Sequence, residues 1–429
     1  MNIIIHRGAK EIGGSCIELQ SGNTRIILDI GLPLQDESGL NFDFNKFKNL
    51  NLSQLLSNGI LPHVKGLYKN DKPEVDAVLI SHPHQDHFGL MQHIHEDIPI
   101  YMSKGTEALI KVTGFFNDVD YIHKNHLITP WETFPIGSFN ITPYLVDHSG
   151  FDALAFLIEA EDKRVFYSGD FRTHGRKWIT TEKIISDPPK NIDYLLLEGT
   201  HIDPINNTSS KIEKTEENIE KDLLQAFTIS SKLILISFSS QNIDRLVSVY
   251  KACRDSKRTL VIDPYTAYIL DQLKPVSSSI PQFNWNNIKI FFTPNSHTKK
   301  LAKTNKLWKY KNAIIKIEEI VSEPSKFVIK TNALDVKIFT NKSLLKNAEL
   351  IYSQWEGYFK KEEAFWKKHS VPVNHIHTSG HAFIKDLKRF ADALNPNHII
   401  PIHTQGSDKF SSVFTQPILK VSDGVKTSL

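Results

Sequence analysis

Short apolar runs separated by turn-forming residues dominate the first half of the chain. Between residues 3 and 32 such runs alternate with glycine-rich turns, and the run from Val75 to Ile80 is rich in β-branched residues and follows Pro73. Short runs of this composition predict buried strands. Longer segments between them, at 91–98 and 106–113, have the length of helices. The pattern therefore predicts alternating strands and helices, which is an α/β fold. Further strands are expected at 98–102, 153–159, 164–167 and 194–198.

A second α/β unit is expected from about Pro204. It opens with a charged, helix-length stretch at 213–227. Apolar runs separated by helix-length segments then predict a parallel-type sheet inserted into the first fold. The chain is expected to return to the first fold after residue 355, which gives the segments 1–205, 206–355 and 356–429. The expected strands of the insert are at 233–238, 259–263, 288–292 and 349–352.

Three histidines and an aspartate directly follow the strand predicted at Val75 to Ile80. They are His82, His84, Asp86 and His87. In an extended stretch His82 and His84 point to the same side, whereas Asp86 and His87 come after the chain has turned, so one loop can face two metal ions. An isolated pair of histidines is more often a surface feature, but four such residues after one strand are far more specific. The cluster predicts a metal site, and imidazole and carboxylate ligands without a thiolate favour zinc, with manganese or magnesium as alternatives.

Other strand ends carry a histidine or an acid as well. Asp29 precedes Gly31 and could be only a turn residue, and Glu198 could be only a helix cap. Asp170 has two carboxylate oxygens and is therefore suited to bridge two cations roughly 3.5–4 Å apart. The candidates at such positions are Asp29, His148, Asp170, Glu198, His381 and His403.

The order of these residues resembles a known family. The H-x-H-x-D-H sequence at 82–87, followed by His148, Asp170 and His403, resembles the signature of the metallo-β-lactamase superfamily. Glu198 and the H-x-S-G-H sequence at 377–381 resemble two motifs of its β-CASP branch, which acts on nucleic acids. The segments 8–14 and 237–246 are similar to parts of ribonuclease J. The resemblance spans essentially the whole chain and implies a metallo-β-lactamase αββα sandwich with an inserted β-CASP α/β domain.

The resemblance also implies a role for each residue. His82, His84 and His148 would bind one divalent ion, Asp86, His87 and His403 would bind a second, and Asp170 would bridge both. Asp29 would orient the metal ligands. His381, oriented by Glu198, would stabilise the developing charge or protonate the leaving oxygen. The implied catalytic residues are Asp86, Glu198 and His381.

The implied activity is hydrolysis of phosphodiester bonds in single-stranded RNA by a hydroxide that two metal ions activate. Cleavage could proceed from the 5′ end, internally, or both. A DNA nuclease of the same branch is the alternative. A small-molecule metallo-hydrolase is less favoured, because it would lack Glu198, His381 and the large insert. A non-catalytic RNA-binding relative is disfavoured too, since the complete ligand set is retained.

A phosphate site is expected in the inserted segment. Ser239 and Ser240 follow the predicted strand at 233–238, and the start of the next helix offers free N–H groups to a phosphate. N-capping by Ser or Asn is the alternative. His377, Ser379 and Gly380 form a second turn with small hydroxyls and backbone donors. Such neutral groups would suit a 5′-monophosphate.

Composition adds little but excludes several classes. Hydrophobic residues make up 40% and charged residues 23% of the 429 residues, which is typical of soluble proteins. Lys and Arg number 51 against 48 Asp and Glu, so any basic surface must be local. The lysines at 299–311, among which Trp308 and Tyr310 lie, favour a solvated helix face over a nucleic-acid contact. Cys16 and Cys253 lie too far apart in sequence to suggest a disulfide framework. No apolar run is long enough to span a membrane. Both observations lead us to expect a cytoplasmic protein.

Two features depart from ribonuclease J. That family continues into a C-terminal domain that helps it to associate, whereas this sequence ends at Leu429, so both a monomer and a homodimer are open. The segment 352–357 reads Tyr-Ser-Gln-Trp-Glu-Gly, which differs from the form expected in ribonuclease J. The substrate preference is therefore expected to differ.

Overall fold

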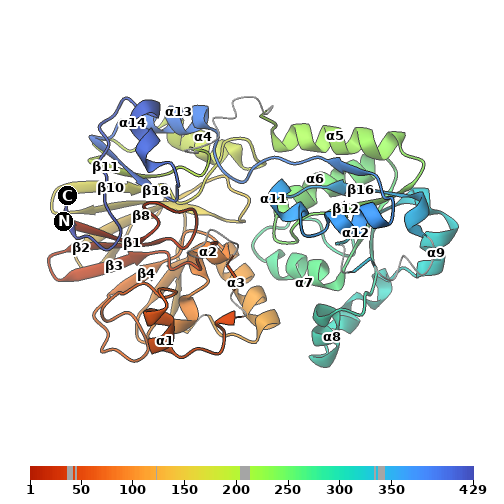
Figure 1. The fold of residues 1–429 in the computed structure, drawn as a ribbon, viewed down its shortest axis with the longest axis horizontal. Helices are drawn as coiled ribbons and strands as arrows, with labels where there is room; N and C mark the ends of the chain where they lie inside the picture. The colour runs from red at the N-terminus through yellow and green to blue at the C-terminus, as the bar shows by residue number, and fades with distance from the viewer. Residues whose placement is uncertain (36–41, 44–45, 122, 203–212, 333–334, 337–343) are drawn as a thin grey trace. The chain divides into compact units, whose positions relative to one another are not determined.

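The protein is described from a computed structural model of the whole chain, which covers residues 1–35, 42–43, 46–121, 123–202, 213–332, 335–336 and 344–429. It folds into two compact units (Figure 1). Unit 1 comprises Met1–Thr173, Lys177–Lys211 and Gly380–Leu429, and unit 2 comprises His174–Arg176 and Ile212–Ser379. Within the described residues, no helix has both the length and the apolar composition needed to cross a membrane.

The first sheet of unit 1 has seven strands in the order β19-β1-β2-β3-β4-β5-β6. Pairing is antiparallel from β19 to β3 and parallel from β3 to β6. Because β1 pairs with β19, the two ends of the chain lie side by side. The strands are β1 (Asn2–Arg7), β2 (Cys16–Ser21), β3 (Thr24–Leu28), β4 (Ala77–Leu79), β5 (Ile100–Met102), β6 (Asn125–Leu127) and β19 (Thr427–Ser428).

The second sheet of unit 1 has six strands in the order β18-β11-β10-β9-β8-β7. Antiparallel hairpins join β7 to β10, and β10, β11 and β18 pair in parallel. The parallel strands all end at one edge of the sheet. The strands are β7 (Phe134–Ile136), β8 (Phe139–Leu145), β9 (Leu154–Ala160), β10 (Lys163–Tyr167), β11 (Tyr194–Glu198) and β18 (His398–Ile402).

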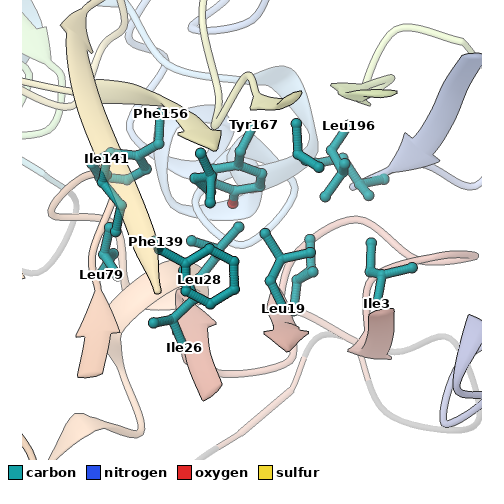
Figure 2. Close-up of a cluster of buried hydrophobic side chains, with 14 of the residues drawn as sticks. Ile3, Leu19, Ile26, Leu28, Leu79, Phe139, Ile141, Phe156, Tyr167 and Leu196 are labelled. Atoms are coloured by element: carbon teal, nitrogen blue, oxygen red, sulfur yellow. The ribbon is translucent and has the colours of Figure 1, made fainter. Parts of the chain in front are cut away.

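The two sheets of unit 1 pack face to face through one apolar core (Figure 2). Alternation along each strand decides which side chains enter it. Ile26 and Leu28 of β3 point into this core with Phe139 and Tyr167, whereas Ile27 belongs to the core on the outer face of the first sheet. That outer face is covered by segments that include α1 (Leu52–Ser57), α2 (Gln85–Phe88) and α3 (Lys104–Asn117).

Helices cover the outer face of the second sheet as well. In α13 (Ile384–Leu394) the buried apolar residues Leu387, Phe390, Ala391 and Leu394 follow helical spacing and form one stripe against the sheet. The other helices there are α4 (Trp178–Ser186) and α14 (Phe410–Val413). Unit 1 therefore has the predicted four-layer αββα architecture.

Unit 2 contains a six-stranded, wholly parallel sheet in the order β14-β13-β15-β12-β16-β17. One face packs on a core that includes Leu235, Leu350 and Trp366, and the alternate residue Ile236 is buried on the other face. The strands are β12 (Leu233–Ser237), β13 (Thr259–Ile262), β14 (Ile288–Ile290), β15 (Phe327–Lys330), β16 (Ala348–Tyr352) and β17 (Val373–His375). The helices are α5 (Glu216–Ile229), α6 (Ile243–Asp255), α7 (Pro264–Leu273), α8 (Ser296–Lys303), α9 (Ile317–Ser322), α11 (Glu356–Phe359) and α12 (Glu363–Lys368).

Several elements of the structure differ from the sequence prediction. The helix predicted at 91–98 is wrong: only a 3-10 turn at Met91–His93 forms, because the backbone there bonds to residues 67–69 instead. The central strand β15 was not predicted. Finally, the chain leaves unit 2 at Gly380 rather than at 356, because β17 pairs with β16 and extends the sheet of unit 2. The predicted boundary at 205–206 lies outside the described residues.

Candidate metal centre

Nine side chains named from the sequence converge in unit 1. They come from α2 and the turn between β4 and α2, from the last residue of β11, from the loops that follow β8, β10 and β18, and from the turn that leads into α13. Within each of three groups, the potential ligand atoms lie within 4.8 Å of one another. The groups are His82, His84 and His148; Asp86, His87, Asp170 and His403; and Asp170, Glu198 and His381.

The first group is a triangle of imidazole nitrogens. His82 Nε2 and His148 Nε2 each lie 3.1 Å from His84 Nδ1. Three nitrogens around a tetrahedral zinc ion, each about 2.0–2.1 Å from it, would be about 3.3 Å apart. Burial lowers the pKa of His84 to about 4 and lowers the pKa of His82 and His148 well below the ordinary value. The three rings are therefore neutral and can offer lone pairs, so the triangle fits one ion.

The second group brings a carboxylate against imidazole lone pairs. His87 Nδ1 lies 2.8 Å from Asp29 Oδ2, so a neutral His87 ring carries its proton on Nδ1 and turns the Nε2 lone pair toward Asp170 Oδ2, 3.1 Å away. Burial alone would lower the pKa of His87, but Asp170 and Asp29 raise it well above its ordinary value. The pocket therefore attracts positive charge to the space beside Nε2.

Several atoms of the second group lack hydrogen bonds. His87 Nε2, His403 Nε2 and both carboxylate oxygens of Asp170 are buried without a hydrogen-bond partner among the described residues. Buried polar atoms are normally satisfied, so such a set requires another partner. His403 Nε2 lies 3.6 Å from Asp170 Oδ2 and 3.8 Å from Asp86 Oδ2. A cation among these atoms would satisfy them together, and the residues present therefore fit a second metal ion.

Asp29 accepts several hydrogen bonds next to the second group. It follows β3 with a φ of 59°, and its Oδ1 accepts the Ser81 N–H at 2.7 Å. Its Oδ2 accepts from Ser81 Oγ at 2.7 Å and from the Tyr167 hydroxyl at 2.6 Å, in addition to its contact with His87. This arrangement supports the predicted role of Asp29 in orienting a ligand, and Ser81 and Tyr167 are partners that the sequence did not reveal.

Close packing fixes α2, the short helix that carries Asp86. A side chain at Gly31 would place its Cβ 1.6 Å from the backbone oxygen of Asp86, so only glycine allows this approach. His403, at the end of β18, is held in turn by Ser15, whose Oγ lies 3.1 Å from its Nδ1. If Nδ1 donates to that oxygen, the Nε2 lone pair faces the cluster.

The third group joins an acid to a histidine. His381 Nδ1 lies 3.3 Å from Glu198 Oε2 and 3.1 Å from Thr200 Oγ1. The Thr200 N–H donates to the same Glu198 oxygen at 3.1 Å. Burial alone would lower the pKa of His381, but Glu198 and Asp170 raise it to about 9. His381 is therefore protonated near neutral pH, and its side chain remains 22% exposed.

The residues predicted to contact phosphate are not brought into one site within either unit. Ser239, Ser240, His377 and Ser379 belong to unit 2, whereas Gly380 belongs to unit 1. Ser239 is exposed, and Ser240 Oγ lies 2.9 Å from Thr266 Oγ1 in a buried position. The cap of α6 is Asn242, whose side chain accepts from the Arg245 N–H. The capping alternative therefore applies to Asn242, and the phosphate role of the other residues stays a prediction.

Comparison with known proteins agrees with the fold. Residues 58–221 match the family described as beta-lactamase superfamily domain, and residues 370–412 match the Zn-dependent metallo-hydrolase RNA specificity domain. Ribonuclease J of Mycoplasma genitalium is 22% identical over 416 residues, which cover 92% of this chain and 66% of that protein. Ribonuclease J 2 of Staphylococcus aureus is 21% identical over 429 residues, which cover 94% of this chain and 68% of that protein. The chain thus spans about two thirds of the length of these relatives.

A solved structure shares the whole fold. A protein of unknown function from Enterococcus faecalis superposes with a TM-score of 0.81 at 20% identity, covering 100% of this chain and 99% of its own. Fold, motif order and matched domains place the chain in the metallo-β-lactamase superfamily. Within that superfamily it is a ribonuclease J-like protein of the β-CASP branch.

Proposed function

We propose that the protein is a metal-dependent ribonuclease of the ribonuclease J type, which hydrolyses phosphodiester bonds of single-stranded RNA. The observation that carries the proposal is the pair Glu198 and His381 beside the metal ligands, with His381 Nδ1 3.3 Å from Glu198 Oε2. A small-molecule hydrolase with the same metal ligands does not require this pair. The relatives named ribonuclease J and the matched RNA specificity domain support the choice of RNA.

The metal cluster supplies the first requirement of the reaction. His82, His84 and His148 would hold one divalent ion, and Asp86, His87 and His403 would hold a second, with Asp170 between them. Two ions bound there would supply an activated water and would neutralise the charge of the attacked phosphate. Zinc is favoured because the donors are imidazoles and carboxylates in a buried site and include no thiolate.

His381 supplies the second requirement, a proton for the leaving oxygen. In the metal-free protein the carboxylates of Glu198 and Asp170 raise the pKa of this imidazole to about 9, and Glu198 stays beside it when Asp170 binds metal. Nδ1 is oriented by Glu198 and Thr200, so we assign proton donation to Nε2. Glu198 acts through His381 and does not itself contact the substrate in this scheme.

The residues with small hydroxyls and backbone donors are assigned to the substrate. We propose that Ser239, Ser240, His377, Ser379 and Gly380 contact RNA phosphates, with preference for a 5′-monophosphate. Neutral donors suit a monophosphate, whereas a triphosphate would demand more positive charge. This assignment rests on residue types and is independent of the metal ligands.

The test is a direct comparison of nucleic acids. RNA and DNA of one sequence, each labelled at the 5′ end, are incubated with the zinc- or manganese-loaded protein. Loss of RNA with a slower loss of DNA, and no reaction after chelation, is the expected result. Faster loss of DNA would favour a DNA nuclease of the same branch, and no loss of either would refute nuclease activity. His63→Ala is the matched control, because His63 is an exposed histidine outside the cluster and its loss should leave the rate unchanged.

A further inference from the structure

Two exposed aromatic rings follow β16 in unit 2. Trp355 precedes α11 and is 60% exposed, and Tyr358 within α11 is 47% exposed. Their ring centroids are 5.2 Å apart with an interplanar angle of 87°, so the edge of one ring meets the face of the other. Phe359 anchors the other side of α11, because its ring contacts Tyr352 and His375 at centroid distances of 4.8 and 4.9 Å. One side of α11 is therefore fixed on the domain and the other presents aromatic rings.

The Trp355 ring is held in place rather than loosely attached. A Cβ added to Gly357 would lie 2.2 Å from Trp355 Cη2 and Cζ3, which means that the ring lies directly against the backbone of Gly357. The turn that carries Trp355 is pinned as well. The Ser353 N–H donates to the backbone carbonyl oxygen of Ser237 at 2.8 Å, and Gln354 Nε2 donates to Ser237 Oγ at 3.0 Å. A large apolar ring is thus fixed in orientation while most of its surface is exposed.

Two lysines lie next to these rings in sequence. Lys360 and Lys361 follow α11 directly and are both exposed, and the acids on either side of them are Glu356, Glu362 and Glu363. Glu362 accepts from Trp366 Nε1 at 3.1 Å, and Glu363 pairs with Lys367 at 2.7 Å. Aromatic rings beside exposed lysines are what proteins use to bind single-stranded nucleic acids, because every base has a face that can stack and every nucleotide carries a phosphate.

We propose that Trp355 and Tyr358 form a stacking site for an unpaired base of single-stranded RNA, with Lys360 and Lys361 attracting its phosphates. The inference rests on the proposed function and extends it, since it assigns substrate binding to residues in unit 2 outside the metal cluster. A fixed ring is suited to this task because no rotamer freedom is lost when the base stacks. The segment 352–357, which departs from the family pattern, thereby acquires a role in substrate preference.

The experiment measures the affinity of a fluorescein-labelled, single-stranded RNA by anisotropy. The His381→Ala protein with its metals bound is the parent, and a gel confirms that the RNA stays intact. Trp355→Leu should weaken binding about 5- to 150-fold, the range expected from removing one aromatic stacking partner. Gly357→Ala should weaken it in the same direction but less, because the new methyl displaces the ring without removing it.

Controls separate stacking from other causes. Trp308→Leu is the matched variant, because Trp308 is 62% exposed in the same unit and lies among the lysines at 299–311. It should keep the parent's affinity. The same RNA made with abasic nucleotides should bind the parent and Trp355→Leu equally. Melting temperature and metal content, compared with the parent, show that each variant is folded.

Two results in the variants would overturn the inference: an unchanged RNA affinity in Trp355→Leu, and an equal loss of affinity in Trp308→Leu. A change of oligomeric state that accompanies the unchanged affinity of Trp355→Leu would assign the rings to a protein contact. Stronger binding of DNA than of RNA would also contradict the stated ligand. The proposed function fails separately, if the unmutated protein binds RNA at this site but does not hydrolyse it.

Discussion

Removing the hydroxyl of Tyr167 tests whether Asp29 must be held in place for metal binding. The hydroxyl donates to Asp29 Oδ2 at 2.6 Å, and Tyr167 is buried in the core between the two sheets of unit 1 (Figure 2). In Tyr167→Phe the ring and its packing stay, and Oδ2 keeps only its contacts with Ser81 and His87. Hydrogen bonds to a charged group contribute roughly 1.5–3 kcal/mol, so the metal-free protein should lose about that much unfolding free energy.

The same substitution should weaken one metal site. Partners that orient a metal-bound histidine typically contribute 10- to 100-fold in affinity. Because Tyr167 acts through Asp29, we expect the lower end, about 10-fold, at the site of His87, and a larger loss in Asp29→Asn. Unfolding in urea measures the stability, and competition with a chromophoric chelator measures the metal affinity. Tyr101→Phe is the control, because among the described residues the Tyr101 hydroxyl makes no hydrogen bond.

Two outcomes in Tyr167→Phe would contradict the role given to this hydroxyl. If Tyr167→Phe loses less than about 0.5 kcal/mol and binds both ions as tightly as the unmutated protein, the hydrogen bond does not hold Asp29 in its orientation. A loss of stability without any loss of metal affinity would assign Tyr167 to the core alone.

Three further outcomes are expected. His381→Ala should leave metal content intact and lower turnover by at least roughly 100-fold, the usual effect of losing a general acid, whereas loss of a metal would show that His381 is a ligand. Burial alone would raise the pKa of Glu18, but hydrogen bonds with His6 and Arg25 lower this pKa from 4.5 to about 2. The stability that ionised Glu18 contributes should therefore be complete above pH 4.5 and should disappear as the pH falls toward 2. Glu18→Gln should flatten the profile of stability against pH, measured in urea, over that interval. RNA with a 5′-monophosphate should be degraded faster than RNA of the same sequence with a 5′-triphosphate or 5′-hydroxyl, and equal rates would show that no such pocket operates.

The sequence predicted the strands and their ends well, because the buried strands are short and β-branched and lie between turn residues. Ligand positions follow from this, since residues such as His82 and Asp170 come directly after a strand. The signal failed where long-range backbone pairing decides the structure. The segment at 91–98 has the length of a helix, but its backbone bonds to residues 67–69. Likewise β17 joins the sheet of unit 2 by pairing with β16.

The residues that support the cluster were also beyond sequence reasoning. Tyr167 reaches Asp29 across 138 positions, and Ser15 reaches His403 across 388. No local pattern marks such pairs, because they arise only when the two sheets stack and the loops meet at one edge. Thr200 is a supporting residue that lies close in sequence to a predicted one, because it comes two positions after Glu198. Its hydroxyl lies 3.1 Å from His381 Nδ1.

The number of metal ions bound per chain, before and after Asp170→Asn, tests the central claim most directly. Both Asp170 oxygens are buried without a hydrogen bond among the described residues, and Oδ2 lies 3.1 Å from His87 Nε2 and 3.7 Å from His82 Nε2, which belong to different groups. We therefore expect elemental analysis to find two ions in the unmutated protein and at most one held tightly in Asp170→Asn. Glu198→Gln should keep both ions and should retain more activity than Asp170→Asn. Two tightly bound ions in Asp170→Asn would contradict the assignment of Asp170 as the bridge.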